Sequence, residues 1–183
     1  IYACGGTYTY DPAQYVPQGK GCEVTPSDGK WIVKQYTAQV GETKYASFKD
    51  AVAAANAITE GPITITLLNN ATLADKALDI TKSMTIALNN NVLSSITPAN
   101  NQTSKLNIKG SNISVTIQGG TINNAKSALS YPSSLLAQTG TNTLILDGVT
   151  IENKGNYALK YQLDDGDLSV SDSAWVDTIP TVT

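Results

Sequence analysis

The sequence contains no arginine and no histidine, and these two absences limit its chemistry. Arginine supplies the planar fork that grips phosphates and carboxylates, and histidine is the side chain that titrates unaided near neutral pH. All 12 basic residues are lysines, against 15 acidic residues, so the net charge is −3. Nucleic-acid binding requires a basic footprint, so we expect no nucleic-acid partner. A zinc site would have only two cysteines and carboxylates to use, which is too few soft ligands.

Charged residues are also scarce, and no long apolar run is present. Only 15% of the residues are charged and 41% are hydrophobic, so a buried core is expected under a surface of Thr, Asn, Ser and Gln. No run approaches the roughly 18–20 apolar residues of a membrane span, so we expect no membrane span in this segment. The chain opens without an initiator Met, which favours a processed or excised piece of a longer protein. This surface composition is typical of extracellular β-proteins and favours a cell-surface location.

The two cysteines, Cys4 and Cys22, predict one disulfide in an oxidising compartment. Two buried free thiols are the alternative. Neither cysteine is expected to be a catalytic nucleophile, because the chain has no histidine to activate one.

Two regions differ in residue pattern. Residues 1–46 are rich in Tyr and in turn signals, which predicts an N-terminal β element. Residues 47–183 begin with a predicted helix from Ser47 to about Ile58, in which Ser47 is the N-cap and Asp50 completes a capping box. Gly61-Pro62 ends this helix, which we expect to cap the end of a sheet.

From residue 63 onward, short alternating strands are separated by Asn, Gly and Ser turns. Three strand starts, Met84, Val115 and Leu144, lie about 30 residues apart, and each is followed by a second strand. Gly119-Gly120 and Asp147-Gly148 occupy the same place in two of these repeats, where a corner is expected. The pattern predicts a mainly β fold, a right-handed single-stranded parallel β-helix. A β-sandwich is the alternative, but its hairpin turns should recur every ~8–12 residues.

The N-terminal motifs resemble a segment of large repetitive surface proteins of gut-type anaerobic bacteria. The matching motifs are Gly5-Gly6-Thr7 with a following Tyr, Asp11-Pro12, Tyr15-Val16 and the turn Asp28-Gly29 before a strand. Residues 45–153 are similar to the pectin-lyase-like β-helical units of those proteins, with a Ser-Phe start, an Ala-rich helix and Gly-Pro-Ile-Thr. The resemblance implies the architecture more than an activity, because adhesins, phage fibres and polysaccharide lyases share it.

The function expected is that of a non-catalytic structural or adhesive module of an extracellular microbial protein. A self-assembling subunit of a bacterial or phage fibre is one alternative, and a polysaccharide-active enzyme is a second. We expect Ile179, Thr181 and Val182 to form a strand that completes the sheet of a neighbouring unit. The expected partners are therefore neighbouring repeats or identical subunits, together with host or microbial glycans.

Two groups of side chains are candidate sites. Calcium is the one cofactor that the sequence suggests. Its weak candidate ligands lie around Gly166 and are Asp164, Asp165 and Asp167. An exposed hairpin turn is the alternative for this segment. Aromatic rings that could stack on sugars are Tyr8, Tyr10, Tyr15 and Trp31. The alternative role of these rings is to pack the small β element. The asparagines at 69–70, 89–91 and 123–124 are expected at corners, with hydrogen bonds along the stack.

Overall fold

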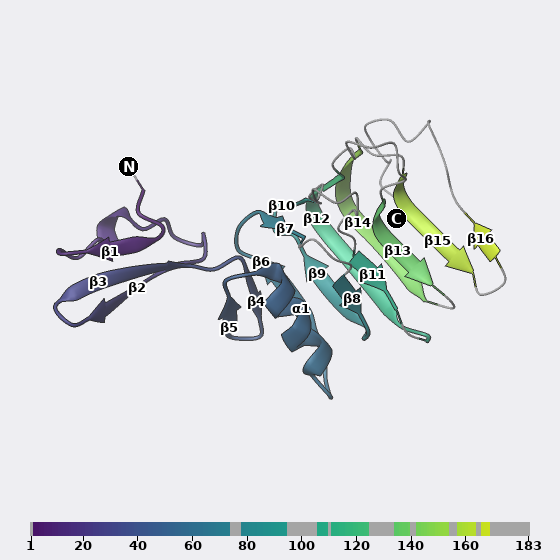
Figure 1. The fold of residues 1–183 in the computed structure, drawn as a ribbon, viewed down its shortest axis with the longest axis horizontal. Helices are drawn as coiled ribbons and strands as arrows, with labels where there is room; N and C mark the ends of the chain where they lie inside the picture. Colours follow the sequence, from purple (N-terminus) through teal and green to yellow (C-terminus); the bar gives the residue numbers. More distant parts are fainter. Residues whose placement is uncertain are drawn as a thin grey trace, which may run out of the picture.

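The computed structural model describes residues 2–73, 78–94, 106–109, 111–124, 134–139, 142–153, 157–163 and 166–168. Residues 124, 134–139, 151, 153, 157–163 and 166–168 are described by their backbone alone. Within these ranges the chain is mainly β, with one α-helix, and its strands form three sheets (Figure 1).

The first sheet, here called the N-terminal sheet, has the order β1-β3-β2 and is antiparallel throughout. Its strands are β1 (Gly6–Tyr8), β2 (Cys22–Ser27) and β3 (Lys30–Gln35), and the 3-10 helix η1 (Ala13–Tyr15) lies between β1 and β2 in sequence. Asp28 and Gly29 join β2 to β3 with φ angles of 48° and 73°. Positive φ at both central residues gives a turn whose twist matches that of the hairpin, and the predicted turn is confirmed.

The second sheet has eight strands in the order β5-β4-β6-β9-β12-β10-β7, and β14 also pairs with β12. The bounds are β4 (Ala38–Val40), β5 (Thr43–Tyr45), β6 (Thr64–Leu67), β7 (Ala71–Thr72), β9 (Met84–Ala87), β10 (Val92–Ser94), β12 (Ser114–Asn124) and β14 (Thr143–Asn153). The β5-β4-β6 pairings are antiparallel and the others are parallel.

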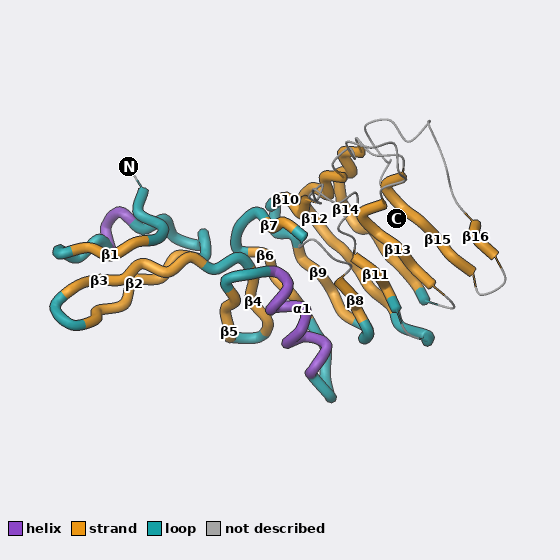
Figure 2. The backbone as a smooth tube through the Cα atoms, in the orientation of Figure 1, coloured by secondary structure: helices purple, strands orange, loops and turns teal. Residues whose placement is uncertain are grey.

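The third sheet has five strands in the order β16-β15-β13-β11-β8. Its bounds are β8 (Leu78–Ile80), β11 (Leu106–Ile108), β13 (Ser134–Thr139), β15 (Tyr157–Leu163) and β16 (Gly166–Leu168). β8, β11, β13 and β15 are parallel, and β16 turns back against β15. In Figure 2 this sheet lies at the end of the molecule away from the N-terminal sheet.

The predicted repeat is present as an in-register stack of parallel strands. Val115 in β12 pairs with Met84 in β9 on one side and with Leu144 in β14 on the other. The predicted corners also align, because Gly119 and Gly148 interrupt β12 and β14 with φ angles of 57° and 58°. Such a left-handed backbone is costly for residues with a Cβ, which explains glycine at both corners.

The prediction of a right-handed single-stranded parallel β-helix is wrong. The strands fall into mixed antiparallel and parallel sheets, and the chain opens with a wholly antiparallel one. The physical reason is the length of the connections. Only two residues join β2 to β3, and only Gly41 and Glu42 join β4 to β5. A two-residue turn can connect only antiparallel strands, since a parallel pair needs a long crossover.

The one described helix, α1 (Phe48–Ala57), is found where the sequence predicts it. The Ser47 hydroxyl accepts a hydrogen bond from the Asp50 backbone N–H at 3.1 Å and donates to the Asp50 carboxylate at 2.7 Å. The buried face of α1 consists of Phe48, Ala51, Val52 and Ala55. This face packs against β4, β5, β6 and β8.

One hydrophobic core lies between the second and third sheets. From the second sheet, Ile65, Ile86 and Ile117 are fully buried, and from the third sheet Ile80, Leu106 and Ile108 are fully buried. The alternation of these positions with polar ones gives each strand one core-facing side. Burying one such side chain stabilises the fold by about 1.5–3 kcal/mol relative to leaving it exposed.

Candidate functional site

The candidate stacking residues are carried by the N-terminal sheet and its flanking segments. Tyr8 in β1 lies directly opposite Trp31 in β3. Directly opposed residues in an antiparallel pair share one face of the sheet, with Cβ atoms about 4.5–5.5 Å apart. Tyr10 follows β1, and its ring contacts the Tyr8 ring edge-on, with centroids 6.0 Å apart and planes at 67°. The structure therefore brings Tyr8, Tyr10 and Trp31 together, and we call these three residues the aromatic platform.

Tyr15, the fourth candidate, lies on η1 and is 44% exposed. Its backbone carbonyl accepts a hydrogen bond from the Ala3 N–H at 2.8 Å, which ties the first residues of the chain to η1. Tyr15 lies on neither β1 nor β3, where Tyr8 and Trp31 are paired, and among the described residues no ring contact joins it to Tyr8 or Tyr10. We therefore leave Tyr15 outside the aromatic platform.

The Tyr8 ring is fixed by local contacts. Its hydroxyl donates a hydrogen bond to the Gly5 carbonyl at 3.0 Å. The ring also lies over Gly6, where an added Cβ would stand 3.6 Å from the ring edge and from the hydroxyl oxygen. Tyr8 and Trp31 are half-buried, whereas Tyr10 is 58% exposed. Tyr8 and Trp31 thus help to pack the small sheet, as the alternative role holds, and Tyr10 adds an exposed ring beside them.

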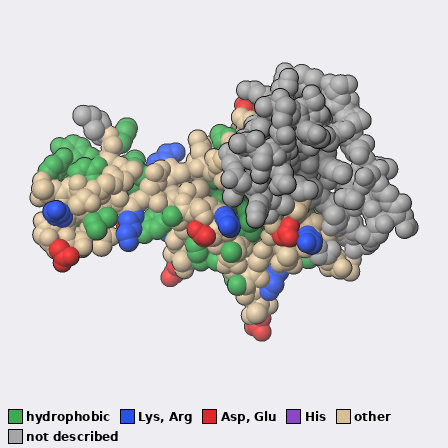
Figure 3. Space-filling view, viewed as in Figure 1, with side chains coloured by type: hydrophobic (Ala, Val, Ile, Leu, Met, Phe, Trp, Pro, Cys, Tyr) green, Lys and Arg blue, Asp and Glu red, His purple; other side chains and the backbone are tan. Residues whose placement is uncertain are grey.

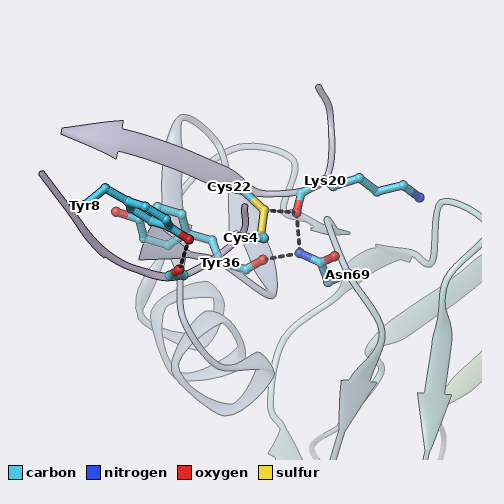
Figure 4. Close-up of a disulfide and its surroundings, with 7 residues drawn as sticks. Cys4, Tyr8, Lys20, Cys22, Tyr36 and Asn69 are labelled. Carbon is cyan, nitrogen blue, oxygen red and sulfur yellow. Dashed lines mark hydrogen bonds between the residues drawn. A yellow bond between two sulfur atoms is a disulfide. The ribbon is translucent and has the colours of Figure 1, made fainter. Parts of the chain in front are cut away.

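The predicted disulfide is present and links Cys4 to Cys22 across 18 positions, with Cα atoms 5.4 Å apart (Figure 4). It joins the segment before β1 to the first residue of β2. The Cys22 sulfur lies 3.3 Å from the Lys20 carbonyl oxygen. A disulfide is typical of proteins that fold in oxidising compartments, and here it holds the two ends of the loop that carries β1 and η1.

Asn69 joins the N-terminal sheet to the second sheet, a role that the sequence did not reveal. Its side-chain amide donates to the Lys20 carbonyl at 2.5 Å and to the Tyr36 carbonyl at 2.8 Å (Figure 4). Gly21 fits tightly between these groups, because an added Cβ would stand 2.4 Å from the Tyr36 oxygen and 2.8 Å from the Leu68 Cβ. The only local signal was a pair of glycines around Lys20, which predicts a turn without naming its distant partner.

The acidic calcium candidates fall mostly outside the described part of the chain. Asp164 and Asp165 are not among the described residues, and Asp167 is described only as backbone in β16, opposite Gln162. Leu163 pairs with Gly166 across an antiparallel ladder, so the two strands have the arrangement of the hairpin alternative. The described residues contain no group of three or more His, Cys, Asp or Glu side chains that could hold a metal ion.

The corner asparagines bond along the stack, as the sequence predicts, and their partners are mainly backbone groups. Asn91 is buried and donates to the Leu67 carbonyl at 3.2 Å, one layer below. The Asn70 side-chain oxygen accepts from the Val92 N–H at 2.9 Å. Asn123 instead donates to the Glu152 carboxylate at 3.0 Å. The contacts of Asn70 and Asn91 satisfy backbone groups at the corners, which is a structural role.

Hydrophobic side chains gather over the N-terminal sheet, at the left of the space-filling view, whereas hydroxyl, amide and backbone atoms dominate the middle (Figure 3). No family model, curated protein or solved structure matches the chain. In the part of the chain that the structure describes, the helix is too short to span a membrane. The predicted strand residues Ile179, Thr181 and Val182 are not among those described.

Proposed function

We propose that the chain is a non-catalytic structural and adhesive module of an extracellular microbial surface protein. In this proposal the stacked sheets are a stiff support, and the N-terminal sheet is the part that meets a partner. Host or microbial glycans are the proposed partners, along with neighbouring copies or repeats.

The observation that supports a stiff support is the continuity of side-chain rows across layers. Ile65, Ile86, Ile117 and Leu146 are successive in-register neighbours in β6, β9, β12 and β14. The first three are fully buried. Each layer is thus packed and hydrogen-bonded to the next along its strands, and bending the stack would break ladder bonds and core contacts together.

The disulfide and the polar outer row support an extracellular role. Outward positions of the stack form an in-register row of hydroxyls, from Thr64 through Thr85 to Thr116. Such uncharged polar surfaces and a covalent cross-link suit a protein that works outside the cell.

The test is retention of chain-coated beads on immobilised mucin under flow. We expect beads carrying the native chain to be retained longer than beads carrying the same chain after reduction and alkylation of its cysteines. Equal retention of the two would mean that the N-terminal sheet is not the adhesive surface, and no retention of either would contradict the adhesive role. Release of unsaturated or reducing sugar products from a panel of polysaccharides would contradict the non-catalytic role.

A second candidate, self-assembly through a sheet edge, is favoured by the position of β14. Among the described strands, β14 pairs with β12 on one side only. Its core-facing Leu144 and Leu146 are only half-buried, and Ile145 is 44% exposed. A strand that pairs on one side only is a template for another strand.

The second candidate is tested by sedimentation at increasing protein concentration. Self-assembly predicts that larger species form and that Ile145→Lys, which places a charge on the edge strand, returns the chain to monomers. Ser114→Lys, on an exposed position of the interior strand β12, is the control that should leave the distribution unchanged. A monomer of about 19.2 kDa at every concentration would exclude this candidate.

A further inference from the structure

The exposed apolar side chains of the described residues are unevenly distributed. Four large hydrophobic side chains are exposed, and three of them are tyrosines that flank the N-terminal sheet. These are Tyr2 at 82%, Tyr10 at 58% and Tyr15 at 44%. A single exposed ring is ordinary, but Tyr10 is exposed and its ring also contacts that of Tyr8, and adjoining rings of this kind mark an interaction site.

The aromatic platform has a shape suited to a ligand ring with an apolar C–H face. Tyr8 and Trp31 stand side by side on one face of the sheet, and the Tyr10 ring meets Tyr8 at 67°. Two rings close to perpendicular form a step, in which a ligand ring can stack on one aromatic face while its edge meets the other. Aromatic faces pack well on the apolar C–H faces of other molecules.

The aromatic platform is also held in place by contacts within the chain itself. The hydrogen bond from the Tyr8 hydroxyl to the Gly5 carbonyl fixes the central ring. The Cys4–Cys22 disulfide closes the loop that carries both β1 and Tyr10. Binding to such a surface costs little ordering of side chains, which favours weak but specific recognition of small ligands.

The balance of charged side chains around the aromatic platform favours an uncharged ligand. Residues 1–46 carry equal numbers of basic and acidic side chains, namely Lys20, Lys30, Lys34 and Lys44 against Asp11, Glu23, Asp28 and Glu42. One lysine is already paired, because the Lys44 amine lies 3.4 Å from the Glu23 carboxylate and 5.8 Å from the centre of the Tyr36 ring. A region without net charge has no excess positive charge to attract polyanions. A neutral sugar needs no such field, since its C–H face stacks and its hydroxyls find polar partners at the rim.

We propose that the aromatic platform binds neutral pyranose oligosaccharides, with the exposed Tyr10 ring as the main stacking surface and Tyr8 and Trp31 beside it. This inference rests on the proposed adhesive function and names its ligand class. Tyr10 carries the test because it is the most exposed of the three rings, so its replacement does least to the fold.

The experiment titrates the full chain with hexasaccharides of β-linked glucose, galactose and N-acetylglucosamine. Trp175→Phe leaves Trp31 as the single tryptophan, so its fluorescence reports the platform. We expect a saturable change in Trp31 emission with at least one neutral sugar. Tyr10→Ala should weaken that binding about fivefold to tenfold, and Tyr10→Phe, which keeps the ring, should restore most of it.

The matched control is Tyr2→Ala, which removes an exposed tyrosine outside the platform. Equal weakening by Tyr2→Ala and Tyr10→Ala would overturn the inference, because it would mean general stickiness. Binding that Tyr10→Ala leaves intact, or no binding to any neutral hexasaccharide, would also overturn it. Circular dichroism checks that each variant is folded.

The two proposals fail in different ways. Beads that stay on mucin, with retention unchanged by Tyr10→Ala, would leave the adhesive function standing and move its binding surface elsewhere. Preference for a uronic-acid hexasaccharide over the neutral ones would reject the inferred ligand class alone. Beads that do not stay would reject the adhesive function itself.

Discussion

The N-terminal sheet and the stacked sheets are stabilised in different ways. In the strands of the N-terminal sheet only Val33 is buried, and the sheet depends on a disulfide and on the hydrogen bonds of Asn69. In the stacked sheets, whole rows of isoleucine and leucine are fully buried. A three-stranded sheet needs a hydrophobic face to be stable by itself, and a single buried side chain is too small a face. In the N-terminal sheet, therefore, a disulfide provides stability that a buried core provides in the stacked sheets, and the aromatic surface of the N-terminal sheet stays exposed.

The largest expected effect comes from opening a cavity in the stack. Ile86→Ala removes a fully buried side chain between in-register neighbours. We expect the free energy of unfolding to fall by about 2–5 kcal/mol, measured by urea denaturation followed by circular dichroism. The half-buried Ile32 of the N-terminal sheet is the comparison site, and Ile32→Ala should cost clearly less. Equal losses at the two positions would contradict the contrast between the regions.

Alanine substitutions at the two adjacent glycines of the β12 corner distinguish the cost of backbone strain from the cost of close packing. Both have positive φ, 57° at Gly119 and 98° at Gly120, so replacement by alanine strains both by about 1–2 kcal/mol. At Gly120 an added Cβ would also stand 2.6 Å from the Asn91 carbonyl oxygen, whereas at Gly119 it meets nothing within 4 Å. We expect Gly120→Ala to lower the free energy of unfolding by a further ~1–3 kcal/mol. Thermal unfolding of the two variants measures this difference, and similar losses of stability at the two positions would contradict the close packing at Gly120.

The junction between the regions is tested by exchanging an amide for a carboxylate. Asn69→Asp replaces the donor that serves the Lys20 and Tyr36 carbonyls by an oxygen that repels them. We expect a loss of about 1–3 kcal/mol in the free energy of unfolding. Asn70→Asp is the matched control, since Asn70 only accepts from the Val92 N–H and a carboxylate can do the same. The two variants are compared by chemical denaturation, and a larger loss at Asn70 would reject the junction.

The smallest effect is expected at the helix cap. Ser47→Ala removes the hydroxyl that accepts from the Asp50 N–H, and we expect a cost of about 1 kcal/mol. Ser47→Thr keeps a hydroxyl that can accept from the Asp50 N–H and donate to the Asp50 carboxylate, and it should recover most of that loss in thermal unfolding. A cost above that of Ile86→Ala would mean that α1 matters more to the stack than its core rows do.

Local signals in the sequence predicted the local features of this fold. The turn Asp28-Gly29 and the cap Ser47 depend on residues near each other in the chain, whereas the spacing of Met84, Val115 and Leu144 is a repeat of about 30 residues that indicates which strands stack. The β-helix prediction was wrong for two reasons: two-residue turns make β2–β3 and β4–β5 antiparallel, and the pairing partners of other strands are not local. β4 joins β6 in an antiparallel register across the whole of α1, and no pattern within either strand states which direction its neighbour runs.

The aromatic site could be predicted only in part for the same reason. The composition showed that residues 1–46 are rich in tyrosine, but grouping Tyr8 with Trp31 required the register of β1 against β3. Asn69 lies 49 positions from Lys20, so its role depends on how the two sheets meet. Tyr15 has the same residue type as Tyr10 yet lies on η1, and sequence alone gives no reason to separate them.

The most direct test of the contrast is amide hydrogen exchange read by mass spectrometry, before and after reduction of the Cys4–Cys22 disulfide. Closing a loop of this length is worth about 3 kcal/mol. We predict that reduction speeds exchange in β1, β2 and β3 and leaves β9 and β12 as protected as before. Loss of protection in both regions, or in neither, would contradict the account that the disulfide holds the N-terminal sheet and the buried rows hold the stack.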